Sequence, residues 1–157
     1  MDVVDWLSKP IDPARLLDAV KLAAGPNKKP RVLHVEDEPD VHQVVNVMLR
    51  DYCDLTWTTT LAASRETIET GEFDLVLLDI GLPDGSGLDL LEDIEKHMFP
   101  PRVVIFSADD VSAEYADKVS AVLTKSTTNN FRLAEVIIRV LKGSANSSKS
   151  VGDEADA

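Results

Sequence analysis

Short runs of branched apolar residues alternate with amphipathic stretches between residues 31 and 141, and this alternation constrains the fold more than any other feature. The third and fourth runs are almost continuously apolar, which is typical of strands buried on both faces. Between the runs, apolar residues recur at helical spacing, most regularly over residues 41–49 and 133–141. The five strand candidates are Arg31–Val35, Asp54–Thr58, Asp74–Asp79, Arg102–Ser107 and Ser120–Lys125.

This order of strands and helices predicts one parallel sheet with right-handed crossovers and helices on both faces. We therefore expect a doubly wound α/β domain over residues 31–142. In such a domain a binding site lies beyond the carboxyl ends of the strands, near the point where the strand order reverses. The fourth helix must be short, because few residues separate the fourth strand from the fifth.

The segments around this domain differ from it in composition. Residues 26–30 (PNKKP) combine two prolines with polar and basic residues, as linkers do. Residues 143–157 contain small and polar residues and almost no large apolar ones, so we expect a disordered tail. Residues 1–25 form a separate N-terminal unit.

The charge balance limits the classes of partner. The chain has 16 basic and 28 acidic residues, a net charge of −12, which disfavours direct binding to nucleic acid. Neither a signal peptide nor an apolar run long enough for a membrane helix is recognisable, so we expect a cytoplasmic location and no membrane contact. Cys53, the single cysteine, and His34 are expected in the core, and His42 and His97 on helix surfaces.

Chemically active residues stand at the carboxyl ends of four strands. Glu36 and Asp37 follow the first strand, Asp79 ends the third, Ser107 the fourth and Lys125 the fifth. In a parallel sheet these ends share one edge, so the carboxylates converge and repel one another unless a cation compensates them. A few carboxylates with water and phosphate oxygens are the usual environment of Mg²⁺.

Each residue alone has a simpler explanation. Acidic residues before a helix complement the helix dipole, and Asp79 at a strand end could be a turn residue. Ser107 could cap the next helix, and Lys125 could be a solvated lysine. The set, in this order and at these strand ends, is what indicates a phosphoryl-transfer site.

Four motifs carry a resemblance to the receiver domain of two-component response regulators, over residues 30–143. They are VLHVEDEPD, DLVLLDIGLPDGSG, VVIFSA and LTK, in the family's order. The resemblance implies the strand order 2-1-3-4-5 of flavodoxin-like folds. It also implies a Mg²⁺ site with Asp37 bound directly and Glu36 through water, completed by Asp79 and the backbone carbonyl of Gly81.

By the same resemblance Asp79 is the phosphoryl acceptor, Lys125 contacts the phosphoryl group and Ser107 is the switch hydroxyl. The implied function is phospho-acceptance in a phosphorelay, with the phosphoryl group taken from phosphohistidine. The partner is then a histidine kinase or a histidine phosphotransfer protein. Self-catalysed phosphotransfer is the enzymatic step expected of the chain itself.

The sequence departs from the family near its fifth strand. Val122 occupies the position of the usual aromatic residue, and Ser126 that of the usual proline. These changes favour a modified or weaker conformational switch. They also support an alternative, a pseudo-receiver that docks partners without phosphorylation. A Mg²⁺-dependent phosphatase is disfavoured, because Gly81 stands where a second acid would be required.

The first 25 residues resemble the end of a receiver. DWLSKPIDPARLLDAVKLAAG has the same plan as the last strand and helix of the central domain, with Trp6 at the aromatic position. We therefore expect a remnant of an upstream receiver and a chain that is the C-terminal receiver of a hybrid sensor histidine kinase. The alternative is an ordinary N-terminal amphipathic helix. A remnant of one strand and one helix cannot bury its own apolar face, so these residues would be exposed, dock on the receiver, or pair with another chain as a homodimer: Ile11, Leu16, Leu17 and Val20.

Overall fold

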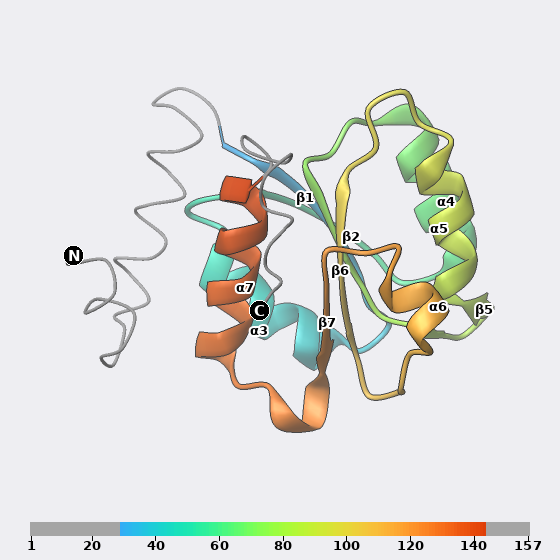
Figure 1. The fold of residues 1–157 in the computed structure, drawn as a ribbon. Coiled ribbons are helices and arrows are strands. Elements are labelled where there is room, and N and C mark those ends of the chain that lie inside the picture. Colours follow the sequence, from blue (N-terminus) through green and yellow to red (C-terminus); the bar gives the residue numbers. More distant parts are fainter. Residues whose placement is uncertain (1–28, 144–157) are drawn as a thin grey trace.

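The computed structural model describes residues 29–143. The predictions for the N-terminal unit, for most of the linker and for the tail concern residues outside this range. The described residues form a sheet covered by helices on both faces (Figure 1).

All five strands of the sheet are parallel. They pair in the order β2-β1-β3-β6-β7, which is 2-1-3-4-5 in chain order, so the predicted fold class is confirmed. The third and fifth strands are each one residue shorter at both ends than the sequence predicted. Their bounds are β1 (Arg31–Val35), β2 (Asp54–Thr58), β3 (Leu75–Leu78), β6 (Arg102–Ser107) and β7 (Ala121–Thr124).

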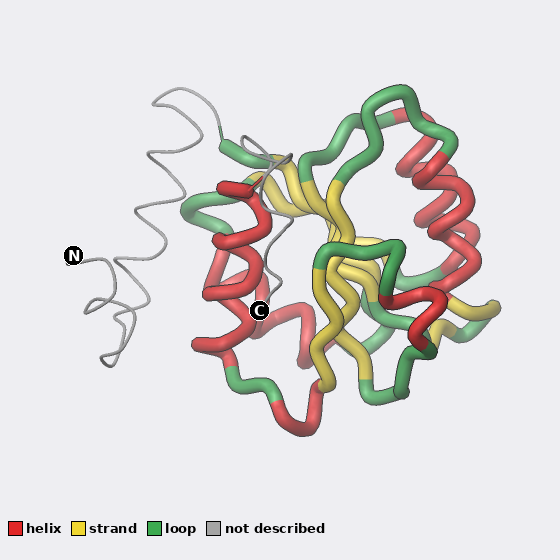
Figure 2. Tube along the Cα trace, viewed as in Figure 1, coloured by secondary structure: helices red, strands yellow, loops and turns green. Residues whose placement is uncertain are grey.

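The helices form two layers, as the sheet topology requires. The first and last lie together on one face, and the others cover the opposite face (Figures 1 and 2). None of the helices that the structure describes is long and apolar enough to cross a membrane. The helices are α3 (Pro39–Leu49), α4 (Leu61–Thr70), α5 (Leu90–Glu95), α6 (Ala113–Ala116) and α7 (Asn130–Gly143), with 3₁₀ turns η1 (Gly87–Asp89) and η2 (Lys125–Thr127).

The interior strands of the sheet, β1, β3 and β6, supply much of the core. Every residue of β3 is buried, and in β1 only Arg31 is exposed, because helices cover both faces of these strands. Cys53 belongs to the core under α3 and α7, as predicted, and burial raises the pKa of its thiol to about 12. His34 is also buried, as predicted.

A small hairpin follows the third strand where the sequence indicated only a turn. Its strands are β4 (Gly81–Leu82) and β5 (Gly85–Ser86). Asp84, between them, accepts hydrogen bonds from the backbone N–H groups of Leu61 (2.7 Å) and Ala62 (3.1 Å), and so caps α4 from outside the helix. A Cβ atom on Gly87 would overlap the carbonyl oxygen of Asp79. Only glycine therefore fits at position 87, where the chain passes back beside the site.

Candidate functional site

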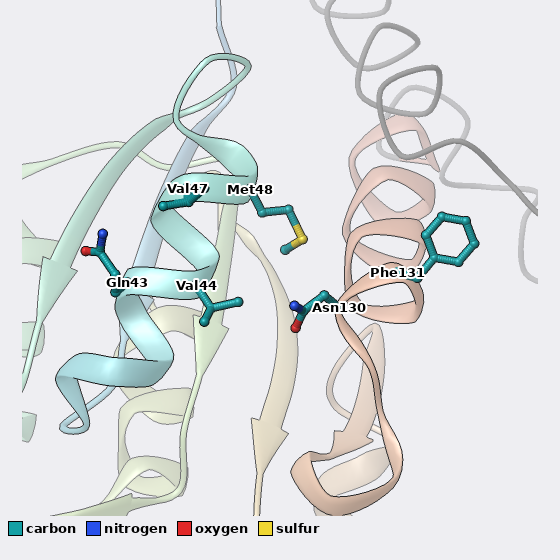
Figure 3. Close-up of a pocket in the computed structure, with 6 residues that line it drawn as sticks. All are labelled: Gln43, Val44, Val47, Met48, Asn130 and Phe131. Atoms are coloured by element: carbon teal, nitrogen blue, oxygen red, sulfur yellow. The ribbon is translucent and has the colours of Figure 1, made fainter.

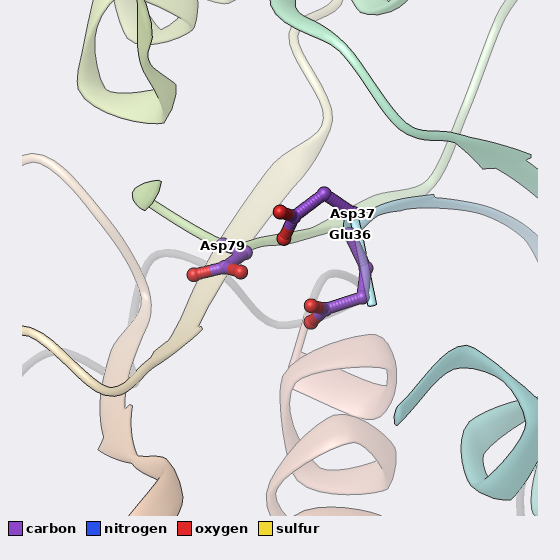
Figure 4. A group of neighbouring side chains, drawn as sticks. All are labelled: Glu36, Asp37 and Asp79. Atoms are coloured by element: carbon purple, nitrogen blue, oxygen red, sulfur yellow. The ribbon is translucent and has the colours of Figure 1, made fainter. Parts of the chain in front are cut away.

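Three carboxylates converge at the carboxyl edge of the sheet. Glu36 and Asp37 directly follow β1, and Asp79 directly follows the adjacent β3. One oxygen from each residue lies within 4.8 Å of the others (Figure 4). The backbone N–H of Asp79 donates to the carbonyl of Val35 (2.9 Å), which extends the pairing of the two strands into the site. The predicted convergence is therefore confirmed.

Lys125 reaches this acidic group from the end of β7. Its Nζ atom lies 3.0 Å from Oε2 of Glu36 and 3.2 Å from Oδ2 of Asp79. Glu36 and Asp79 are buried, whereas Asp37 lies closer to solvent. One ammonium therefore faces two desolvated carboxylates, which leaves a local excess of negative charge.

Burial and this charge excess change the proton affinity of Glu36. Burial is the main cause that raises the pKa of Glu36, to about 7; the hydrogen bond from Lys125 opposes the rise, and the charge of Asp79 adds to it. For Lys125, burial alone would lower the pKa. The hydrogen bond to Glu36 and the charges of Glu36 and Asp79 outweigh burial, so the pKa is raised and the ammonium stays charged.

The second oxygen of Glu36 tests whether a metal fits here. Among residues 29–143, Oε1 of Glu36 is the one buried side-chain nitrogen or oxygen atom that has no hydrogen-bond partner. An unpartnered buried carboxylate oxygen is costly unless a cation or a donor approaches it. Oxygen ligands with surplus negative charge suit a hard divalent cation such as Mg²⁺. The residues present thus fit the ion that the resemblance to receiver domains implies.

Ser107 and Gly81 occupy the flanks of the site. Ser107 is buried at the end of β6, and its hydroxyl accepts a hydrogen bond from the backbone N–H of Asp109 (3.3 Å). The N–H of Gly81 donates to Oδ1 of Asp79 (3.3 Å), while a Cβ on Gly81 would lie 3.5 Å from Oδ2 of Asp109. The carboxylate of Asp109 therefore lies close to Gly81, at the rim of the site.

A Trp–His–His cluster supports the acidic turn, and sequence reasoning missed it. The indole N–H of Trp57 donates to the backbone carbonyl of Glu36 (2.7 Å). The ring of Trp57 stacks on His42, with centroids 4.1 Å apart and planes at 6°, and Nδ1 of His42 lies 3.0 Å from Nδ1 of His34. His42 lies on α3 and is partly exposed, as the sequence led us to expect, but Trp57 and His34 cover part of its ring.

The segment between β6 and η2, where the sequence departs from the receiver pattern, is short and largely exposed. The helix α6 has four residues, none of them buried, which confirms the predicted short fourth helix. Val122 is 37% exposed, and Ser126 lies in the turn η2. Val122, in the edge strand β7, pairs with Ile105 and carries no aromatic ring.

Comparison with known proteins identifies the family. Residues 32–137 match the family described as the response regulator receiver domain. The response regulator protein PmrA of Pseudomonas aeruginosa is 32% identical over 111 residues, which cover 70% of this chain and 50% of PmrA. The cell cycle transcriptional regulator CtrA of Caulobacter vibrioides is 30% identical over 132 residues, covering 78% and 56%. The chain thus spans about half the length of these curated relatives.

Solved structures agree with this assignment. The signal receiver domain of a LuxO repressor protein from Vibrio parahaemolyticus is similar with a TM-score of 0.67 and 28% identity, covering 79% of this chain and 98% of that one. The response regulator TrrA from Thermotoga maritima, solved with Mg²⁺ and BeF, has a TM-score of 0.63 at 23% identity, covers 71% and 98%, and supports the fold alone. The chain belongs to the response regulator receiver domain family and is a phospho-acceptor module of two-component signalling.

Proposed function

We propose that Asp79 is the residue that accepts the phosphoryl group, from a phosphohistidine of a histidine kinase or a histidine phosphotransfer protein. The observation that carries this proposal is the pairing of Asp79 with Lys125 (3.2 Å) beside the buried, half-unpartnered carboxylate of Glu36. A turn or cap aspartate needs neither a partly buried ammonium nor a second buried acid beside it.

The transfer follows from the positions of these groups. A carboxylate oxygen of Asp79 attacks phosphorus, the P–N bond to the donor imidazole breaks, and the imidazole nitrogen keeps the bonding pair. Lys125, held charged by its acidic neighbours, offsets negative charge on the phosphoryl oxygens. Positioning and charge neutralisation supply most of the rate in reactions of this kind.

Glu36, Asp37, Asp79 and the carbonyl of Gly81 are proposed to hold Mg²⁺. When bound, the ion would neutralise charge on the transferred phosphoryl group. The surplus negative charge and the unpartnered Oε1 of Glu36 support this assignment. The ion would also stabilise the ionised carboxylate of Glu36, whose pKa is raised by burial and, to a smaller extent, by the charge of Asp79.

Ser107 is proposed to read the phosphorylated state. Its hydroxyl accepts a hydrogen bond from the N–H of Asp109, so its own proton is available to donate to a phosphoryl oxygen on Asp79. Such a bond would pull the segment before α6 toward the site. Because Val122 cannot swing a ring into the space vacated, we propose a small conformational response.

Incubation with a small phosphodonor such as phosphoramidate, with and without Mg²⁺, tests the assignment by intact mass. We expect one phosphoryl group, dependent on Mg²⁺, in the full chain and none in Asp79→Asn. Asp84→Asn is the matched control, since Asp84 caps α4 and should leave labelling intact. Labelling that persists in Asp79→Asn would exclude Asp79 as the acceptor. Labelling absent with both the small donor and a kinase would instead favour a docking-only module.

The context of a hybrid sensor histidine kinase is a further proposal. It is supported by the resemblance of residues 1–25 to the last strand and helix of a receiver. Phosphotransfer assays with a kinase domain encoded upstream in the same reading frame would test it. Transfer to Asp79 from that kinase is the expected result.

A further inference from the structure

An apolar groove lies between α3 and α7, on the face of the sheet away from α4 and α5. Its volume is about 370 Å³, and most of its lining is contributed by apolar side chains. Val44 and Met48 project from α3 toward α7, and Asn130 faces them across the gap (Figure 3). Val44 is 43% exposed and Val47 is 53% exposed, which is unusual for two valines one turn apart.

The chain enters the described structure close to this groove. The carbonyl of Pro30 accepts a hydrogen bond from the N–H of Asp54 (2.8 Å), and the N–H of Cys53 donates to the carbonyl of Leu49, the last residue of α3. Pro30 therefore lies near the C-terminal end of α3, the end that carries Val47 and Met48. Any segment that precedes Pro30 is tethered at this end of the groove.

The preceding sequence predicts an amphipathic helix that would fit the groove. On a helical projection Leu16, Leu17 and Val20 share one face, whereas Leu22 lies on the opposite one. A helix from Asp12 to Gly25 is about 21 Å long, and five linker residues span at most about 17 Å. With that length and that linker, a helix over residues 12–25 could lie along α3 and parallel to it, with its apolar face toward the groove.

We infer that residues 12–25 dock in the groove between α3 and α7 of the same chain. The short tether gives the segment a local concentration in the millimolar range, so a modest apolar contact suffices. A second copy would have to bury roughly 1,200 Å² or more in total for a stable dimer, and a groove of this size offers only part of that area. Docking also covers Val44 and Val47, which the described part of the chain leaves exposed.

Hydrogen–deuterium exchange on the full chain tests this inference. We expect amides of residues 14–24 to exchange at least about tenfold more slowly than in an unstructured chain, a ratio that corresponds to 1.4 kcal/mol. Leu17→Asp should remove this protection and speed exchange in α3 near Val47. Leu22→Asp, the matched control on the opposite helix face, should change neither.

Cysteine pairs identify the occupant directly. Leu17→Cys with Val44→Cys should form a disulfide within one chain under mild oxidation, whereas Leu22→Cys with Val44→Cys should not; native Cys53 is buried and its thiol pKa is raised, so it does not compete. Unprotected amides in residues 14–24 of the unmodified chain would overturn the inference. So would equal effects of the two aspartate variants, or disulfides that form only between chains, which would assign the groove to a second copy.

Discussion

The two halves of the carboxyl edge of the sheet are built differently. At the ends of β1 and β3 the strands are buried and carry three carboxylates within 4.8 Å of one another. At the ends of β6 and β7 the helix between the strands has four residues, and no residue of β7 is fully buried. The first half supplies the three carboxylates, whereas the second half contributes Lys125 and Ser107 but has a short, exposed helix and a partly exposed edge strand.

Lys125 joins the two halves. It extends from the edge strand β7, yet its ammonium bonds to acids that follow β1 and β3. Removal of the Lys125 side chain should therefore break the contact between the three carboxylates and the segment that follows β6. The comparison teaches that the proposed acceptor site can be complete while the segment around α6 and β7 is small and exposed. The predictions below test the two halves in turn.

Lys125→Ala should have the largest effect on function. It leaves two buried carboxylates without their cation and removes charge compensation for the phosphoryl oxygens, so we expect a loss of about 10²–10³ in the rate of phosphorylation. The rate is measured by phosphoramidate labelling at saturating Mg²⁺. Lys118→Ala, an exposed lysine beside α6, is the control and should be nearly neutral. Similar rates in both variants would contradict the central role given to Lys125.

Leu77→Ala should have the largest effect on stability. Leu77 is buried at the centre of the sheet, and such truncations cost about 2–5 kcal/mol in the free energy of unfolding. Val122→Ala, on the partly exposed edge strand, should cost well under about 1 kcal/mol. Urea unfolding of both variants measures the difference. Equal costs would mean that the two halves are packed alike.

Glu36 should make stability depend on pH when Mg²⁺ is absent. Its pKa is about 7 in the folded state and 4.5 as the unperturbed value, so the folded state binds more protons between these limits. The free energy of unfolding should therefore fall as pH rises from about 4.5 to 7, and the loss should persist above pH 7. Mg²⁺ should reduce the loss by stabilising the ionised carboxylate.

Glu36→Gln isolates this contribution. Chemical unfolding at several pH values with EDTA should give a flatter profile for Glu36→Gln than for the unmodified chain. Glu92→Gln, an exposed substitution on α5, should keep the original slope. An unchanged slope in Glu36→Gln would assign the pH dependence to another group.

Trp57→Phe should have the smallest of these effects. It keeps a ring beside His42 but removes the hydrogen bond to the carbonyl of Glu36, which contributes about 1 kcal/mol. We expect Mg²⁺ affinity, measured by calorimetry, to fall a few-fold because the acidic turn is held less firmly. Trp6→Phe is the matched control. Unchanged affinity in Trp57→Phe would restrict the Trp–His–His cluster to a packing role.

The sequence predicted the parts that follow from periodicity and from strand ends. The near-continuous apolar runs predict β3 and β6, and the shared edge of a parallel sheet predicts that Glu36, Asp79 and Lys125 lie together, as they do. Cys53 in the core was likewise predictable, since free cysteine is among the residue types that are most often buried.

Contacts between side chains distant in sequence could not be predicted. The hydrogen bond from Trp57 to Glu36 spans 21 residues, and its geometry depends on the register of β2 against β1. Asp84 caps a helix that begins 23 residues earlier, so no local capping pattern reveals it. The unpartnered Oε1 of Glu36 depends on rotamer and burial, which strand order alone does not determine.

Reductive mapping of the phosphorylated chain tests the central claim most directly. Borohydride converts an aspartyl phosphate to homoserine, so treatment after phosphoramidate labelling in Mg²⁺ marks the acceptor, and peptide mass spectrometry locates it. The account predicts homoserine at position 79 and at no other aspartate. Homoserine at Asp37 or Asp109, with Asp79 unchanged, would contradict it.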